Sequence, residues 1–152
     1  MKKLFPNSIV YKSKLWDVHQ DWEVPIAGFF IMAPTRKGVR TFTDLTDSEA
    51  LEFMQVLRQV RKGMTEVLGI KDVYFFQNED TTHGFHFWIF PRHNWMKKFG
   101  IKIQSVRPII EYAKQHMLDE ENHNLVLEYA DKMKEYMSKK STELSNNDAL
   151  SG

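Results

Sequence analysis

One long amphipathic stripe limits the folds open to this chain, because it separates two groups of strand-like segments. Apolar residues recur in it with the helical period, at Ala50, Phe53, Met54, Leu57, Val60, Met64, Val67 and Leu68. Thr46 and Glu49 precede the stripe with the spacing of a capping box, and Gly69 follows it. The pattern predicts a single helix of about 20 residues.

Segments rich in β-branched and aromatic residues flank this helix. They cover residues 9–11, 15–19 and 28–33 before it, and 72–77 and 85–90 after it, where Pro91 should end the last strand. Two further helical patterns occupy residues 105–117 and 119–137. This order predicts an α+β fold with an antiparallel sheet of about five strands, one long helix on a face and extra C-terminal helices.

The second C-terminal pattern carries its apolar residues on one face, which favours packing over a cofactor site. They are Val126, Tyr129, Ala130, Met133, Tyr136 and Met137. A length of 152 residues suits one domain, which we expect over residues 1–139. The polar residues 140–152 are predicted to form a tail without structure.

Charge and cysteine content exclude several classes of function. Lys plus Arg is 21 and Asp plus Glu is 20, so the net charge of +1 creates no field that would attract nucleic acid. The chain has no cysteine, which excludes disulfides, thiol nucleophiles and cysteine-ligated metals. No apolar run approaches the roughly 20 residues that span a bilayer. We expect no membrane partner, no secretory signal and a cytoplasmic location.

Histidines cluster near the last predicted strand. Three of the six, His83, His86 and His93, lie between residues 83 and 93. Strand alternation places His86 in mid-strand, on one face with Gly84, Trp88 and Phe90, and it places Phe85, Phe87 and Ile89 on the other. Because imidazole has a pKa near 6.5, much of it is neutral at cytoplasmic pH and can act as a nucleophile.

Two other roles for these histidines stay open. His86 could be a core residue whose ring nitrogens bond to the backbone. Alternatively, His83, His86 and His93 could supply the three imidazoles of an open zinc site. On a regular strand His83 and His86 face opposite ways, so a shared metal requires a bulge at Gly84.

Residues 85–92, Phe-His-Phe-Trp-Ile-Phe-Pro-Arg, resemble the signature of the histidine-triad (HIT) superfamily, in which alternating histidines on a strand often precede Pro-Arg. Residues 24–34 resemble the Pro-x-x-Gly-His strand of that family. Residues 41–46 and 75–78 are similar to its loop before the long helix and to its penultimate strand. The resemblance spans roughly residues 15–93 in the family's order and implies the HIT-like fold.

The chain departs from the family at several positions. The outer triad positions hold Gly84 and Trp88, so His86, at the position of the family's nucleophile, is the one histidine retained. Phe29 replaces the histidine of Gly-His, and Asp80 stands where glutamine is more usual.

The resemblance implies that His86 attacks the α-phosphorus of a nucleotide and forms a nucleotidyl intermediate that water hydrolyses. One ring nitrogen of His86 would be held by a backbone carbonyl. The other residues expected to bind the nucleotide or its phosphates are Asp21 at the ribose, together with Asn78, Thr81, Trp88 and His83. His83 or His93 could replace the lost acid.

Loss of two triad histidines should change the substrate. A polyphosphate leaves without much protonation, whereas an amine needs a proton, so we expect dinucleoside polyphosphates such as diadenosine tetraphosphate to be preferred over phosphoramidates. The alternative is a nucleotide-binding protein of the same fold with weak or no turnover. The resemblance also implies a homodimer and no required cofactor, and it leaves open whether Mg²⁺ accompanies the substrate phosphates.

Overall fold

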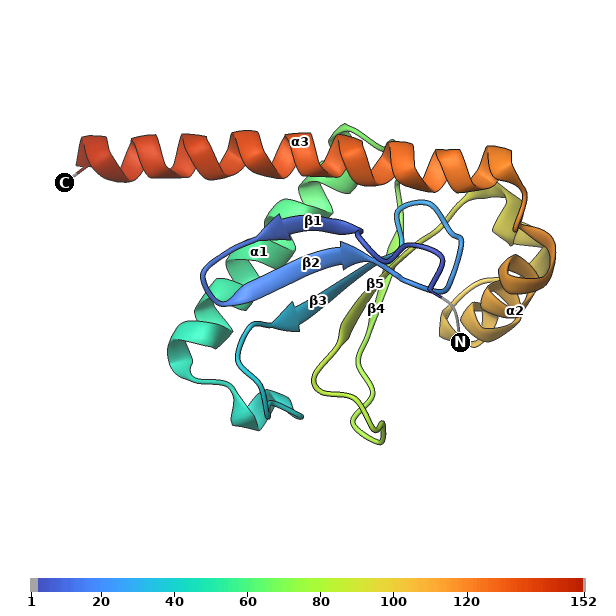
Figure 1. Ribbon diagram of the computed structural model, residues 1–152, viewed down its shortest axis with the longest axis horizontal. Helices are drawn as coiled ribbons and strands as arrows, with labels where there is room; N and C mark the ends of the chain where they lie inside the picture. Colours follow the sequence, from blue (N-terminus) through green and yellow to red (C-terminus); the bar gives the residue numbers. More distant parts are fainter. Residues whose placement is uncertain (1–2, 152) are drawn as a thin grey trace.

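The computed structural model describes the backbone of residues 3–151 and the side chains of residues 3–141. Its centre is a five-stranded sheet with the order β1-β2-β3-β5-β4, in which all neighbouring strands are antiparallel (Figure 1). The strands are β1 (Ile9–Lys12), β2 (Trp16–Gln20), β3 (Phe30–Pro34), β4 (Val73–Phe76) and β5 (Phe87–Pro91). The predicted α+β class and antiparallel sheet are confirmed.

Helix α1 (Asp47–Glu66) covers one face of the sheet, as its apolar stripe predicts (Figure 1). Thr46 Oγ1 accepts the Glu49 N–H at 3.1 Å, and Glu49 Oε1 accepts the Thr46 N–H at 2.8 Å. The capping box is therefore confirmed at the predicted residues. The core between helix and sheet includes Trp16, Val18, Phe30, Met32, Phe53, Val56, Val60, Met64, Phe85 and Ile89.

Helix α2 (Val106–His116) packs on the opposite face of the sheet, after two short 3₁₀ turns at Asn94–Phe99 and Ile103–Ser105. A third 3₁₀ turn, Phe42–Asp44, precedes α1. The core beneath α2 contains Val24, Ile26, Phe29, Phe90, Met96, Val106, Ile109 and Ala113. Ile89 and Phe90 thus belong to different cores, which confirms the predicted alternation along β5.

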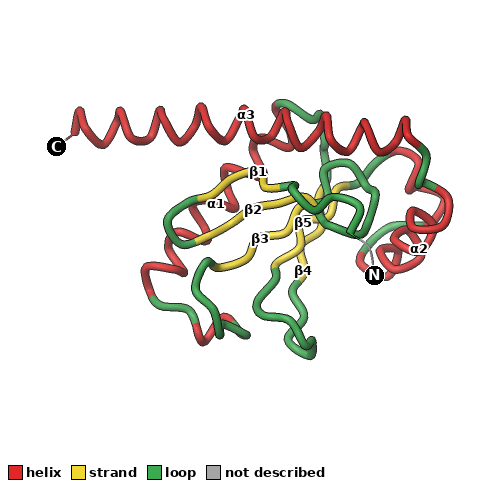
Figure 2. The backbone as a smooth tube through the Cα atoms, viewed as in Figure 1, coloured by secondary structure: helices red, strands yellow, loops and turns green. Residues whose placement is uncertain are grey.

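Helix α3 (Glu120–Ser151) crosses above β1 and runs past the sheet (Figure 2). Its predicted stripe packs as expected, with Val126, Met133, Tyr136 and Met137 buried. The helix continues to Ser151, but the side chains from residue 142 onward lie outside the described residues, so the domain boundary at residue 139 and the tail stay predictions. No helix within the described residues is both long and apolar enough to cross a membrane.

Strand β5 begins at Phe87, so the prediction that His86 lies in mid-strand is wrong. The reason lies in the register with β3, where Phe30 pairs with Ile89 and Met32 with Phe87. Two residues beyond Met32, at the next position of β3 whose backbone faces β5, stands Pro34, which has no N–H to donate. Phe85 N–H instead donates to the carbonyl of Val39 at 2.8 Å, in the loop that follows β3. His86 therefore lies where the chain leaves the sheet.

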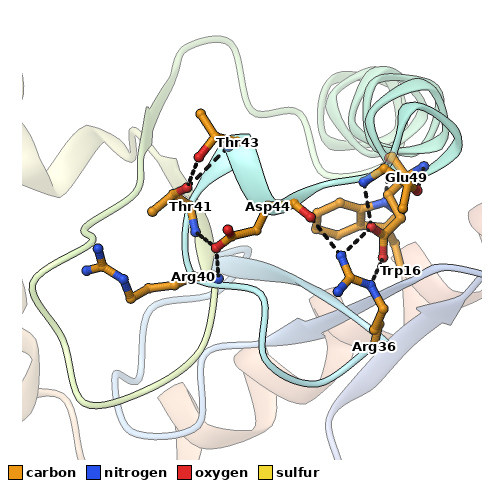
Figure 3. A network of polar contacts seen from close by, with 8 residues as sticks. Trp16, Arg36, Arg40, Thr41, Thr43, Asp44 and Glu49 are labelled. Atoms are coloured by element: carbon orange, nitrogen blue, oxygen red, sulfur yellow. Dashed lines mark hydrogen bonds and ion pairs between the residues drawn. The ribbon is translucent and has the colours of Figure 1, made fainter.

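The loop between β3 and α1 supports the loop between β4 and β5. It is fixed at α1 by Arg36, whose Nη2 and Nε donate to the Glu49 carboxylate at 2.8 and 3.1 Å (Figure 3). Asp44 Oδ2 accepts the Arg40 N–H at 3.0 Å. The Arg40 guanidinium then donates to the Glu79 carbonyl at 2.9 Å. This contact ties the loop that precedes His86 to the body of the protein.

Candidate functional site

Four aromatic rings form a group with His86 on the sheet face opposite α1, and three of them contact the His86 ring. The His86 ring centroid lies 5.7 Å from Trp22, 5.9 Å from His83 and 5.6 Å from Trp88. His19 extends the group by stacking on Trp22 at 4.0 Å. We call these five residues the aromatic cluster. His86 is half-buried, so its imidazole is not enclosed by the core.

The surroundings of His86 favour its neutral form. Burial lowers the pKa of its imidazole below the usual value, and the neighbouring His83 lowers that pKa further. No described residue forms a hydrogen bond with either ring nitrogen of His86. The expected backbone carbonyl partner is thus absent among the described residues, because the chain leaves the sheet at this point. The alternative of a core histidine bonded to the backbone is also wrong for His86.

Asp21 lies beside the cluster and holds Trp88. Its Oδ2 accepts the Trp88 indole N–H at 3.3 Å, and its Oδ1 accepts the N–H groups of Glu23 and Val24, each at 2.9 Å. The side chain is buried, and burial raises the pKa of its carboxyl. Asp21, which the resemblance places at a ribose, therefore already accepts hydrogen bonds from Trp88 and from the turn that follows it.

The other predicted binding residues come from the loop between β4 and β5. Thr81 Oγ1 donates to the His83 carbonyl at 3.2 Å, so its hydroxyl closes a local turn. Asn78 is exposed and lines a groove next to α2. The fold therefore brings His83, His86 and Trp88 together, whereas Thr81 and Asn78 lie on the loop and make no hydrogen bond or ring contact with His86.

His93 does not belong to the cluster. It follows β5 at the other end of the strand, and its Nε2 lies 2.6 Å from the carbonyl oxygen of Ala27. The alternative in which His83, His86 and His93 share one metal is therefore wrong. Within the described residues no group of three or more His, Cys, Asp or Glu side chains is arranged to hold a metal ion.

Two members of the cluster, His19 and Trp22, were not predicted from the sequence. His19 is buried in β2, its Nδ1 lies 3.2 Å from the Gln20 carbonyl oxygen, and burial lowers its pKa to about 4. Trp22 is half-buried, with the Lys3 ammonium 4.8 Å from its ring centroid. The one available signal was the position of Trp22 directly after Asp21.

Comparisons with known proteins identify the fold through structure alone. No family model matches the chain, and no curated protein matches it. A histidine triad (HIT) protein from Sinorhizobium meliloti superposes with a TM-score of 0.64 at 13% identity, covering 85% of this chain and 88% of that one. A zinc-bound histidine triad family protein from Mycobacterium smegmatis gives 0.60 at 13% identity, with 94% and 89% covered.

A longer protein also matches over part of its length. For the NitFhit protein of C. elegans the TM-score is 0.53 at 18% identity, and the match covers 71% of this chain but 27% of that one. At identities this low, the superpositions establish a shared fold and nothing finer. The chain therefore has the fold of the histidine-triad proteins.

Proposed function

We propose that the chain binds a nucleotide at the aromatic cluster and cleaves it at the α-phosphorus through His86. The observation that carries this proposal is the half-buried imidazole of His86, bordered by the rings of Trp22 and Trp88, where burial lowers its pKa and so favours the neutral form. Neutral imidazole is the nucleophilic form, and aromatic rings nearby offer stacking surfaces for a base.

The proposed reaction has two displacements at phosphorus. A ring nitrogen of His86 forms a bond to the α-phosphorus while the bond from that phosphorus to the bridging oxygen breaks, and the remaining phosphates leave with the electron pair. Water then attacks the nucleotidyl-imidazole, releases a nucleoside monophosphate and regenerates His86. The mechanism uses no resident cofactor, and Mg²⁺ could enter with the substrate phosphates.

The residues around His86 would bind the rest of the nucleotide. The ring of Trp22 would stack on the base. Asp21, directly before Trp22 in the sequence, would accept a hydrogen bond from a sugar hydroxyl. Thr81 could turn its hydroxyl from the His83 carbonyl toward a phosphate oxygen. Asn78 on the same loop is exposed and free to meet phosphate or water.

Phosphoric anhydrides are the substrate class that this site favours. Trp88 lies beside His86 at a distance of 5.6 Å between ring centroids, and an indole cannot donate a proton as an acid. His83 is the nearest imidazole to His86 and is exposed. A dinucleoside polyphosphate such as diadenosine tetraphosphate needs little help for its leaving group, so we expect it to react faster than a nucleoside phosphoramidate.

Nucleotide binding without turnover is the second candidate, and one observation favours it. The imidazole of His86 has no hydrogen bond from a described residue to fix its orientation or tautomer. Precise orientation contributes much of the rate in group transfer, so a ring held only by packing would react slowly. The residues that would contact the base and the sugar do not depend on how the His86 ring is held, so binding would be retained.

We also propose that the chain forms a homodimer through the outer edge of β4, which pairs with β5 on its other side and with no further strand of residues 3–151. Phe75 on β4 is 44% exposed and Phe42 is 47% exposed, and both rings contact Phe87. An unpaired edge beside exposed aromatic rings suits strand pairing between copies. Sedimentation should show a dimer that Phe75→Asp converts to a monomer, and a monomeric wild type would contradict this.

Turnover and binding can be measured together to separate the two candidates. The chain is incubated with diadenosine tetraphosphate, its products are separated, and the affinity for AMP is measured by calorimetry. Hydrolysis that disappears in His86→Ala but survives in His93→Gln supports the catalytic proposal. Tight AMP binding without hydrolysis supports the binding-only function. No binding of either nucleotide would refute both.

A further inference from the structure

A groove with an apolar floor lies between the end of β4 and helix α2. Its apolar floor is formed by Phe76, Val106 and Ile110, Ile103 also lines it, and its volume is about 450 Å³. Ile103 is 56% exposed, which leaves a branched aliphatic side chain at the mouth of the groove. The volume falls within the roughly 300–1,000 Å³ of small-molecule pockets.

A ring contact links this groove to the aromatic cluster. The Phe76 ring stacks on Trp88 with centroids 5.6 Å apart and planes inclined by 13°, and Trp88 contacts His86 at 5.6 Å. Phe76 and Trp88 are paired across β4 and β5, so their side chains point to the same face of the sheet. One indole ring therefore separates the floor of the groove from the proposed nucleophile.

The rim of the groove suits an anionic ligand that carries a flat ring. Arg107 and Lys114 lie on it, each near a carboxylate, at 3.3 Å from Glu111 and 3.9 Å from Glu23. Both pairs are exposed, so the attraction within each is weak and a phosphate chain can compete for the cations. Asn78 adds a side-chain amide, which can both donate to and accept from the edge of a base.

From this arrangement we infer that the groove binds the second base of a dinucleoside polyphosphate while the first nucleotide lies at His86. The inference rests on the proposed function and extends it, because it assigns a specificity role to helix α2. The stack of Phe76 and Trp88 lies between the two sites, and the phosphate chain passes over it toward the cations on the rim. A mononucleotide would fill one site, and a dinucleotide would fill both.

Binding of three ligands to the whole chain tests the groove. The ligands are AMP, adenosine 5′-tetraphosphate and a methylene-bridged analogue of diadenosine tetraphosphate that resists hydrolysis. The last two carry the same number of phosphates, so their difference in affinity reports the second base. Since stacking of a base on protein side chains is worth about fivefold to a hundredfold in affinity, the dinucleotide analogue should bind at least about fivefold more tightly.

Two exposed isoleucines give a matched pair of variants. Ile103→Asn places an amide in the mouth of the groove and should abolish the preference for the second base while leaving the affinity for AMP unchanged. Ile101→Asn makes the same change two residues earlier, at a side chain that is 64% exposed and does not line the groove. This control should keep the preference.

The outcomes separate this inference from the proposed function. If AMP binds but the dinucleotide analogue shows no advantage, or if Ile103→Asn keeps that advantage, the inference is wrong and the proposed function stands. If no adenine nucleotide binds, both are wrong. If Ile103→Asn changes the sedimentation of the protein but not its ligand preference, the groove is an interface between copies and the inference is wrong.

Discussion

Replacing Glu49 with glutamine isolates one ion pair that fixes the loop beside the site. The Glu49 carboxylate accepts hydrogen bonds from Arg36 at 2.8 and 3.1 Å (Figure 3). It also accepts the Thr46 N–H at 2.8 Å. Glutamine keeps an amide oxygen for Thr46, since capping boxes accept either residue. Its NH₂ group, however, would face the Arg36 guanidinium. The substitution therefore removes the ion pair and preserves the cap of α1.

The size of the effect follows from the carboxyl's pKa. The hydrogen bond with Arg36, helped by the Thr46 N–H, lowers the pKa of Glu49 from 4.5 to about 2. At about 1.4 kcal/mol per pKa unit this corresponds to about 3 kcal/mol. The Arg36 side chain is 46% exposed, so solvent screens the pair, and we expect about 2 kcal/mol of lost unfolding free energy.

The stability contributed by the Glu49 carboxylate depends on pH. Because the folded state lowers the pKa, the stabilisation is fully present above pH 4.5 and is lost as the pH falls toward about 2. Urea unfolding of wild type and Glu49→Gln should therefore differ most at neutral pH and converge in acid. Glu66→Gln, at an exposed carboxylate of the same helix, is the control. A difference that stays constant down to acid pH would refute the reasoning.

Three further predictions concern helix packing, nucleophile ionisation and loop support. In Gly63→Ala the new Cβ would lie 2.6 Å from the Tyr136 ring. The cost of overpacking, about 1–3 kcal/mol, should exceed the gain in helix propensity of about 1 kcal/mol. Urea unfolding should therefore show an unfolding free energy lower by about 1 kcal/mol. Because the pKa of His86 is lowered, kcat/KM should decrease only at pH values below the usual histidine pKa. His83→Gln removes one cause of this shift and should move the decrease to higher pH. An unchanged pH profile would show that His83 does not affect the ionisation of His86. Arg40→Ala removes the bond to the Glu79 carbonyl, worth about 1 kcal/mol, so it should lower the unfolding free energy by no more than about that amount and raise KM for the dinucleotide about fivefold. Equal KM values would show that this bond does not position the loop.

Features encoded by neighbouring residues could be predicted from the sequence. The capping box of Thr46 and Glu49 and the stripe of α1 depend on residues a few positions apart, and both are confirmed. The opposite orientations of Ile89 and Phe90 likewise follow from strand alternation. In each case local geometry alone decides where the side chain points.

Features set by distant partners could not be predicted in this way. His86 lies outside the strand because Pro34, far away in the sequence, ends the ladder with β3. Asp21 bonds to Trp88, and His93 meets the Ala27 carbonyl, across 67 and 66 residues respectively. These contacts depend on the order of strands in the sheet, which no local pattern of residues specifies. The sequence therefore indicated candidate residues for the site, but not the residues with which they form contacts.

The central claim is that His86 forms a covalent bond with the α-phosphorus of a bound nucleotide. Rapid mixing with diadenosine tetraphosphate, a non-acidic quench and intact-mass measurement would detect this bond directly. We predict a species heavier by one adenylyl group in the wild type and in His93→Gln, and its absence in His86→Ala. A wild type that hydrolyses the substrate without this species, or an adduct that persists in His86→Ala, would contradict the account.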